Sequence, residues 1–156
     1  MERDLNMNLL TRKANINDIE KGLLELFIEG YKHHLKGRPD IFLNLSNEEL
    51  KEELTNQFDE TNIIIISDEE KIVGFISYKI KQKNKKKLLY VKELVIKESY
   101  RNKGLASKLM NEMNLIAKKE KCSRIELNCW SFNKNALEMY EHLGYKKQRV
   151  IYELEI

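Results

Sequence analysis

The stretch YVKELVIKESYRNKGLASKLMNEM, residues 90–113, begins with the pattern of a β-strand and ends with the apolar spacing of a helix. A short loop, Arg101-Asn102-Lys103-Gly104, joins the two. A helix that starts here directs unpaired backbone N–H groups and the positive end of its dipole at one spot. Phosphate or pyrophosphate is the natural occupant of such a corner. Taken alone, the loop is first interpreted as a tight turn with solvated charges.

The regions on either side predict one mixed α/β domain over residues 1–156. We expect helices after a cap at Asn15 or Asn17, after a capping box at Ser46, from residue 105 until Cys122, and from 135 to 143. Residues 33–42 and 81–87 are expected to be loops. The strands are expected at residues 9–13, 62–66, 72–80, 88–96, 124–130 and 150–156. This order predicts an antiparallel meander that leads into a right-handed βαβ unit.

Composition narrows the classes of function. The 28 basic and 25 acidic residues leave a net charge of +3, which is too balanced to indicate nucleic-acid binding. No apolar run approaches the roughly 18 residues of a membrane span, and residues 1–8 lack the apolar core of a signal peptide. We therefore expect a cytoplasmic protein without a membrane or nucleic-acid partner. Cys122 and Cys129 lack metal-ligand spacing, so we expect free thiols and no metal.

Two spaced motifs carry a resemblance to a known family. The segment R-x-x-G-L-A, residues 101–106, follows a strand that ends in E-L-V-I, and N-x-x-A-x-x-x-Y-x-x-x-G-Y follows at residues 133–145. Together they resemble the signatures of the GCN5-related N-acetyltransferase (GNAT) superfamily, whose first motif is Q/R-x-x-G-x-G/A. The resemblance covers roughly residues 9–156. It implies an α/β (α+β) fold with a mixed, mostly antiparallel central sheet and helices on both faces.

The resemblance also implies acetyl-CoA as co-substrate. Its pyrophosphate would be wrapped by the loop and first helical turn, and its pantetheine arm would lie along the backbone of Leu94 and Ile96, where the strand diverges from residues 124–130. The backbone N–H of Val95 would face the reacting carbonyl oxygen. Asn133 would either contact the cofactor or cap the following helix. The residues implied in the loop and turn are Arg101, Asn102, Lys103, Gly104, Leu105, Ala106 and Ser107.

Two residues are candidates for proton transfer. If its strand is regular, Glu93 shares a face with the apolar residues Leu89, Val91 and Val95, where burial would raise its pKa and suit it to general-base work. A salt bridge at a strand edge is the alternative. By the resemblance, the hydroxyl of Tyr140 donates a proton to the departing CoA sulfur; a buried core tyrosine is the alternative. Neither cysteine has a motif-linked histidine, so we do not expect a covalent enzyme intermediate.

The predicted function is transfer of an acetyl group to the primary amine of a small molecule. The alternatives are a peptide or protein N-terminal α-amine acetyltransferase and a CoA-binding regulator without catalysis. Tyr31, His34, Asp40 and Trp130 are candidates for contact with the acceptor. The lysine-rich residues 79–87 lack interleaved aromatics and are read as a solvated hairpin loop. A homodimer is compatible with the resemblance, with residues 150–156 as an edge for pairing.

Overall fold

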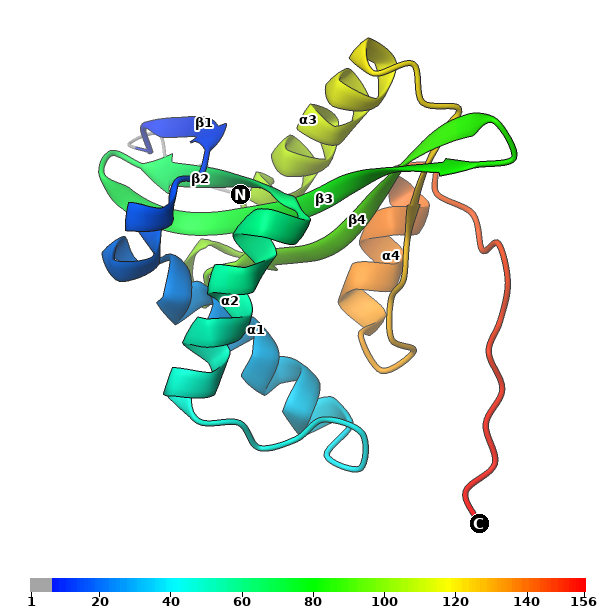
Figure 1. Ribbon diagram of the computed structural model, residues 1–156, viewed down its shortest axis with the longest axis horizontal. Coiled ribbons are helices and arrows are strands. Elements are labelled where there is room, and N and C mark those ends of the chain that lie inside the picture. Colours follow the sequence, from blue (N-terminus) through cyan, green and yellow to red (C-terminus); the bar gives the residue numbers. More distant parts are fainter. Residues whose placement is uncertain (1–6) are drawn as a thin grey trace.

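The computed structural model describes residues 7–156, so the N-terminal residues 1–6, part of the region that argued against a signal peptide, lie outside it. A five-stranded sheet in the order β1-β2-β3-β4-β5 forms the centre (Figure 1). Its first four strands are antiparallel and β5 is parallel to β4. The strands are β1 (Leu9–Lys13), β2 (Asn62–Asp68), β3 (Lys71–Lys83), β4 (Lys86–Ile96) and β5 (Arg124–Leu127).

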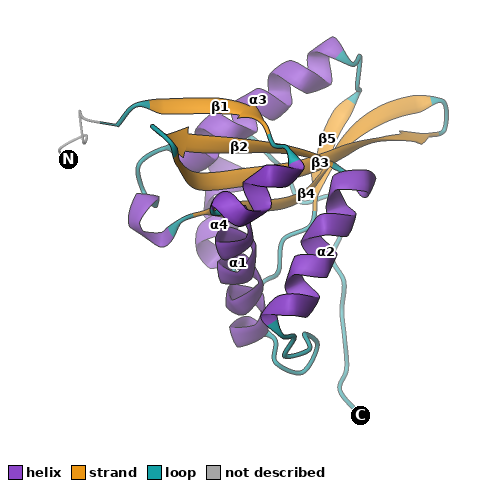
Figure 2. Ribbon diagram, turned by 60° about the vertical axis from the view of Figure 1, so that its left-hand side comes forward, coloured by secondary structure: helices purple, strands orange, loops and turns teal. Residues whose placement is uncertain are grey.

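Helices α1 (Leu23–Gly37) and α2 (Asn47–Glu60) pack on one face of the sheet, and α3 (Leu105–Lys119) packs on the other (Figure 2). Helix α4 (Lys134–His142) follows β5, and Tyr140 from it packs with the cluster on the α3 side. The prediction of a mixed, mostly antiparallel sheet with helices on both faces is confirmed.

Two core clusters lie on the two faces of the sheet because successive residues of a strand point to opposite faces. Ile65 and Phe75 belong to the cluster under α1 and α2, whereas their chain neighbours Ile66 and Ile76 belong to the cluster under α3. All four side chains are fully buried. The central strands therefore read as continuous apolar runs rather than as an alternating pattern.

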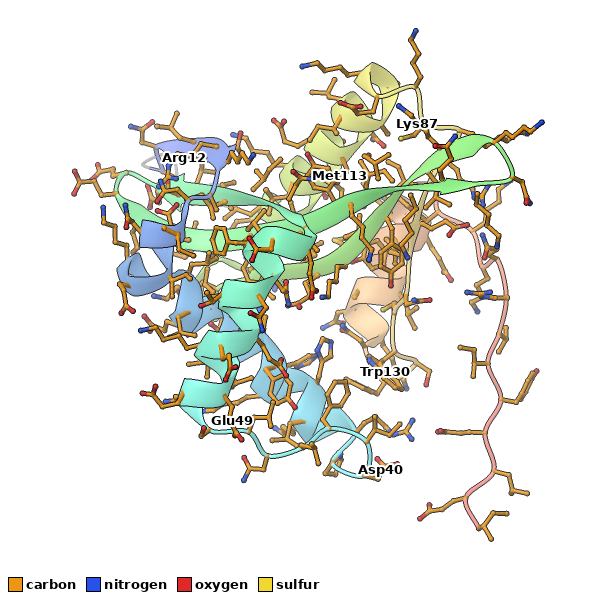
Figure 3. The ribbon with its side chains drawn as sticks, in the orientation of Figure 1. Arg12, Asp40, Glu49, Lys87, Met113 and Trp130 are labelled. Carbon is orange, nitrogen blue, oxygen red and sulfur yellow. The ribbon has the colours of Figure 1, made fainter. Side chains whose placement is uncertain are left out.

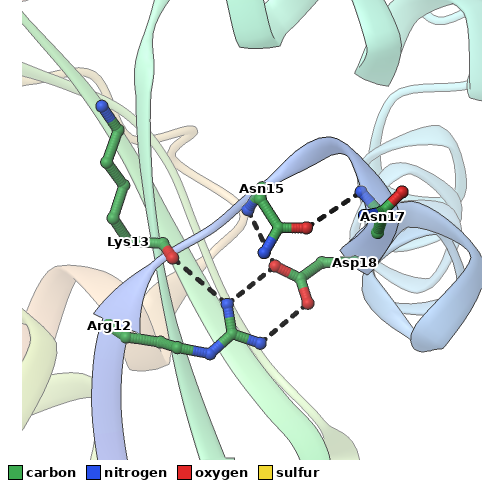
Figure 4. A network of polar contacts seen from close by, with 5 residues as sticks. All are labelled: Arg12, Lys13, Asn15, Asn17 and Asp18. Atoms are coloured by element: carbon green, nitrogen blue, oxygen red, sulfur yellow. Dashed lines mark hydrogen bonds and ion pairs between the residues drawn. The ribbon is translucent and has the colours of Figure 1, made fainter.

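The first helical segment, η1 (Ile16–Lys21), is held by a polar network (Figure 4). Asn15 is its N-cap, and Asp18 accepts a hydrogen bond from the backbone N–H of Asn15 at 2.8 Å. Both guanidinium nitrogens of Arg12 donate to the Asp18 carboxylate at 2.8 Å, and this carboxylate side chain is only 2% exposed. The pair joins β1 to the first helical turn. The predicted capping box at Ser46 is also present, at the start of α2.

Two predicted loops are present but shorter than predicted, at residues 38–42 and 84–85. Helix α1 continues through Gly37, so His33 and His34 are helical, because no residue before Pro39 interrupts the helix. Likewise, β3 and β4 extend through the lysine-rich segment, and only Asn84 and Lys85 form the turn, both with positive φ. A two-residue turn of this kind matches the twist of a hairpin and lets the flanking lysines pair as strand residues.

The C-terminal strand predicted at residues 150–156 is wrong. The structure assigns no secondary structure to residues 145–156, which leave the body as an extended tail (Figure 1). Strand β5 is shorter than predicted and ends at Leu127. The alternating pattern alone cannot form a strand, because a strand needs a neighbour to pair with. None of the helices in residues 7–156 is long and apolar enough to cross a membrane.

Candidate functional site

The sheet opens between its two parallel strands. The pairing of β4 with β5 begins at Leu88 and Arg124 and ends at Val91 and Leu127. Strand β4 continues to Ile96 and keeps its pairing with β3 along this length. Within residues 7–156, the β5 side of residues 92–96 is therefore a free strand edge, and a short 3-10 helix, η2 (Glu98–Tyr100), connects it to the loop that leads into α3. This is the divergence of strands that the sequence resemblance implies.

A β-bulge lies at the start of this free edge. Tyr78 pairs with Val91 but its neighbour Ser77 pairs with Glu93, so Lys92 is an extra residue in β4. The bulge reverses the alternation: Leu89 and Val91 lie in the α3 cluster, whereas Val95 lies in the cluster under α1 and α2. The expectation that Glu93 shares a face with Leu89 and Val91 is therefore wrong. Glu93 points to the face of α2, together with Val95.

On that face, Glu93 meets a polar residue from α2. The Gln57 side-chain amide donates a 2.8 Å hydrogen bond to its carboxylate. Burial raises the pKa of Glu93 above the ordinary value of a glutamate, while Gln57 and Lys92 oppose the shift. The residue keeps partial contact with solvent. Among the buried side-chain oxygens of residues 7–156, Gln57 Oε1 and Ser77 Oγ have no hydrogen-bond partner, so the surroundings of Glu93 hold unused acceptors for a water or an ammonium group.

The free edge presents the backbone of alternate residues. The Lys97 N–H donates to the Val73 carbonyl, and Arg101 Nε donates to the Ile96 carbonyl from the other side. Since successive residues of an antiparallel strand point their N–H groups to opposite edges, Leu94 and Ile96 point to the free edge and Val95 points to β3. The expected use of the Val95 N–H toward a reacting oxygen is therefore contradicted. Leu94 directly follows Glu93 and is the better placed donor.

The loop after β4 has the backbone of an anion cradle. Asn102 and Gly104 both have left-handed φ values, of 61° and 83°, and Gly104 precedes the first turn of α3. The first N–H groups of a helix, here those of Leu105, Ala106 and Ser107, have no acceptor within the helix. A Cβ placed on Gly104 would have no other atom of residues 7–156 within 4 Å, so the described part of the chain leaves open space on its outer side. These features fit a bound phosphate group.

The Arg101 side chain is held at the base of the loop. Its guanidinium donates to the Ile96 carbonyl at 3.1 Å and forms an ion pair with Glu29 of α1 at 3.2 Å. Glu29 also accepts the Glu98 backbone N–H. Arg101 thus ties the loop to both the end of β4 and helix α1. Lys103 extends from the same loop beside the Tyr100 ring.

Tyr140 lies beside the open end of β5. Burial raises the pKa of its phenol, and nearby Cys129 and Tyr145 add to the shift. Cys129 is two residues beyond the end of β5, where the two parallel strands diverge. The Asn133 side chain makes no capping hydrogen bond, although the residue occupies the N-cap position of α4. Burial also raises the pKa values of the Cys122 and Cys129 thiols, which disfavours the thiolate that a nucleophile requires.

The four acceptor-site candidates meet in one cluster around Phe42. The ring centroids of Tyr31, His34 and Trp130 lie 5.8, 5.5 and 5.6 Å from that of Phe42. Asp40 joins through Arg38, which forms two hydrogen bonds with it and lies over the Trp130 ring at 5.4 Å. Figure 3 shows Trp130 and Asp40 at the same end of the molecule, away from Lys87. Burial lowers the pKa of His34, which favours the neutral imidazole.

Three residues of this region, Gln57, Phe42 and Phe132, were not among the residues predicted from the sequence. Gln57 carries no motif, and only the bulge in β4 brings Glu93 under it. Phe132 stacks on Trp130, and a Cβ on Gly37 would overlap its ring, so the loop before α4 packs tightly on the end of α1. Phe42 and Phe132 each lie two residues after a predicted acceptor-site residue, Asp40 and Trp130. An aromatic residue near a predicted site more often belongs to the hydrophobic core, so neither was singled out. Two shallow surface hollows, near Arg12 and near Tyr100, do not include Glu93 or Tyr140.

Residues 24–145 match the model of the Acetyltransferase (GNAT) family. A segment of 56 residues is 30% identical to the thialysine N-epsilon-acetyltransferase of Bos taurus and covers 36% of this chain. The matched segment spans 33% of that curated relative, about a third of its length, and the relative from Sus scrofa matches to the same extent.

Solved structures share the fold over most of the chain. A tetramutant of the BH1408 protein from Bacillus halodurans has a TM-score of 0.82 at 23% identity, with 94% of this chain and 99% of that chain covered. The glucosamine-6-phosphate N-acetyltransferase of Arabidopsis thaliana has a TM-score of 0.67 at 22% identity, with 95% and 98% covered. At these identities the likeness concerns the fold alone.

Proposed function

The chain belongs to the acetyltransferase (GNAT) family, and we propose that it is an acetyl-CoA-dependent N-acetyltransferase that acts on the primary amine of a small molecule. The observation that carries the proposal is the free edge of β4 beyond Val91, which has a partly buried carboxylate, Glu93, at one end and the left-handed loop at the other. This arrangement offers a donor edge for an extended ligand, an anion cradle and a proton acceptor within one continuous segment.

The residues present fit acetyl-CoA. The loop from Arg101 to Gly104 and the first turn of α3 would hold the pyrophosphate through backbone N–H groups, because Gly104 leaves open space outside it. The backbone of Leu94 and Ile96 would pair with the pantetheine arm in the manner of an added strand. The Asn133 side chain makes no capping hydrogen bond to α4, so its amide is available to bind the same ligand.

The bound thioester would supply an activated acetyl group for direct attack by the amine. Glu93 would accept a proton from the substrate ammonium, directly or through water, since a carboxylate with a raised pKa is a stronger base than an ordinary one. The Leu94 N–H would donate to the developing oxyanion. Tyr140 would give its proton to the departing sulfur, and its raised pKa keeps the phenol protonated at neutral pH.

The acceptor is proposed to lie against the aromatic cluster of Tyr31, His34, Phe42, Trp130 and Phe132. Its rings could receive the apolar or cationic part of an amine, while Asp40 and Arg38 offer charges at its rim. The name of the Bos taurus relative refers to thialysine, which is a small amine. This name supports a small-molecule acceptor over a peptide.

The test is a panel of amines in which CoA release is followed. Polyamines, aminoglycosides, amino acids, amino sugars and N-terminal peptides are each incubated with acetyl-CoA, and calorimetry measures acetyl-CoA binding without acceptor. We expect acetyl-CoA binding and turnover with at least one small amine. If only the peptides are acetylated, the acceptor is a peptide amine and not a small molecule. If acetyl-CoA binds but no amine in the panel is acetylated, the result favours a CoA-binding regulator without catalysis. Absence of binding would overturn the whole proposal.

A further inference from the structure

Helix α2 carries one polar side chain in its buried face. The buried residues of this helix are Leu50, Leu54 and Gln57, at the spacing of one helical stripe, and they are 1%, 0% and 5% exposed. Both leucines belong to the core cluster under α1 and α2. A buried amide is costly unless its donors and its acceptor find partners, so a glutamine at the third position of this stripe needs a physical reason.

Within the described residues, the Gln57 amide is only half used. Its Nε2 donates to Glu93 Oε1 at 2.8 Å, whereas its Oε1 has no hydrogen-bond partner among residues 7–156. The backbone of Gln57 is held firmly, because its carbonyl accepts the backbone N–H and the hydroxyl of Thr61 at 2.8 and 2.9 Å. The main chain is thus fixed, while no group in this part of the chain holds the amide oxygen in one orientation.

The charged groups that act on Glu93 are Lys92, its neighbour on β4, and Glu53 of α2. Lys92 forms its ion pair with Glu60 of α2, at 3.7 Å. On β3, the cross-strand neighbour of Glu93 is the uncharged Ser77. Within residues 7–156, a neutral amide is therefore the hydrogen-bond donor to the Glu93 carboxylate.

A neutral amide suits a carboxyl group that must gain and lose a proton. A carboxylate only accepts hydrogen bonds, whereas a carboxylic acid also donates one. An amide can meet both needs, because its NH₂ group donates and, after half a turn about its last side-chain torsion, its oxygen accepts. A lysine or arginine would serve only the ionised form and would hold the proton affinity of the carboxyl low, and an apolar residue would serve neither form.

We propose that Gln57 is a positioning residue for Glu93, whose amide donates to the carboxylate and turns to accept a hydrogen bond from the carboxylic acid. The unpartnered Oε1 is the atom that would receive this hydrogen bond. Glu93 then keeps its orientation before and after it takes a proton from the substrate ammonium. That proton leaves to solvent, with which Glu93 keeps partial contact. The inference rests on the proposed function, because it assigns to Gln57 the support of the base in that reaction.

The first test follows the Glu93 carboxyl on the full chain without acetyl-CoA or acceptor. Carbon-13 NMR of glutamate-labelled protein gives its titration, and the resonance is assigned by its loss in Glu93→Gln. Gln57→Met, which keeps the side-chain length without the donor, should move the midpoint to higher pH by about one unit or more. Gln57→Lys, which supplies a cation, should move it to lower pH. Asn56→Met, at an exposed amide of the same helix, is the matched control and should leave the midpoint unchanged.

The second test uses an amine that the panel identifies as an acceptor. In each Gln57 variant, the acidic limb of kcat/KM should move in the same direction as the carboxyl titration, which a purely structural role would not produce. The kcat at the optimum pH should fall in both variants by about tenfold or more, since neither new side chain serves both protonation states. Circular dichroism checks the fold, and if Gln57→Lys does not fold, Gln57→Met alone decides.

The proposal is overturned if Gln57→Met leaves the titration of Glu93 unchanged. It is also overturned if both variants move the titration in the same direction, because packing would then explain the effect, or if kcat/KM does not follow the titration. If the titrations move as expected but no amine is acetylated, the proposed function fails, while the hydrogen bond from Gln57 to Glu93 stands.

Discussion

Glu93 is the residue on which the proposed chemistry depends most. We predict that Glu93→Gln lowers kcat by about 10²- to 10⁴-fold, which is the usual contribution of general-base catalysis. Glu52→Gln, an exposed carboxylate on α2, is the control and should retain activity. Steady-state kinetics measures both. A variant as active as the original chain would exclude the base.

The raised pKa of Glu93 predicts the direction in which activity and stability change with pH. A base must be unprotonated, so the activity of the original chain should fall as pH decreases through this raised pKa, at a pH above the ordinary range of a glutamate. The unfolded chain ionises this carboxyl more readily, so its contribution to stability decreases as pH rises through the same window. Glu93→Gln should therefore increase the melting temperature at neutral pH while it reduces activity.

The proposed role of Tyr140 as a proton donor can be tested with the neighbouring tyrosine, Tyr145, as a control. We predict that Tyr140→Phe lowers kcat by about 10²-fold or more and leaves the affinity for acetyl-CoA nearly unchanged, because only the proton donor is removed. Tyr145 packs edge-on against Tyr140 with ring centroids 5.8 Å apart, and its own hydroxyl is buried and has no hydrogen-bond partner among residues 7–156. Tyr145→Phe is thus the control. Equal effects of the two changes would point to packing rather than proton donation.

Asp18 stabilises the fold from a position remote from the candidate site. We predict that Asp18→Asn lowers the free energy of unfolding by about 1.5–3 kcal/mol, since it weakens charged hydrogen bonds from Arg12. The folded-state pKa of Asp18 is lowered by this hydrogen bonding, so its contribution is present at neutral pH and is lost as pH falls through that low pKa. Urea unfolding at pH 7 and at acidic pH measures the difference. The exposed Asp59→Asn should change stability by less than about 0.5 kcal/mol.

At the scale of elements, the role of the loop between β4 and α3 can be tested by a comparison of Gly104 with Gly144. Gly104 and Gly144 both have positive φ, of 83° and 95°, and in the described part of the chain a Cβ at either would meet no atom within 4 Å. Each change to alanine should therefore destabilise the chain by a similar amount, about 1–2 kcal/mol. We predict that only Gly104→Ala also weakens acetyl-CoA binding, by about tenfold or more, because its methyl group would enter the cradle. Calorimetry distinguishes the two variants, and equal affinities would remove the cradle from the proposal.

The β4 bulge is the other element that decides the site. A regular strand would place Glu93 on the α3 face, among Leu89 and Val91. One additional residue, Lys92, turns the carboxylate toward α2 and also marks where pairing with β5 has stopped. The bulge thus separates the half of β4 that pairs with both β3 and β5 from the half that has a free edge.

At the scale of the whole molecule, one sheet separates two cores. Each central strand contributes to both clusters, so neither face can lose its packing without the other. We predict a single unfolding transition for the whole chain, as expected for one domain, with coincident midpoints in far-UV and near-UV circular dichroism. Leu54→Ala on one face and Leu109→Ala on the other should each destabilise this one transition by about 2–5 kcal/mol.

The control for this prediction is Leu115→Ala, because that side chain is 62% exposed. Its effect should remain below about 0.5 kcal/mol. Separate midpoints for the two spectral regions, or a variant that shifts only one of them, would contradict a single cooperative unit.

The sequence by itself determined the features that depend on local chemistry. The capping box at Ser46, a cap near the start of the first helical segment, the start of α3 after Gly104 and the buried strand runs follow from side chains and backbone within a few residues. The two motifs also indicated the family, which the family model confirms. Local hydrogen bonds and apolar periodicity involve residues within one or two turns of each other, so they can be recognised in the sequence without knowledge of the fold.

Only the tertiary structure decided the features that need a partner distant in the chain. The face of Glu93 depends on a bulge in the register with β3, the aromatic cluster joins α1 to the loop after β5, and the Arg38 ion pair reaches Glu153. The tail shows the limit most clearly: residues 150–156 have the pattern of a strand but no strand beside them. A pattern specifies which face a strand would bury, whereas pairing requires an edge that another part of the structure must supply.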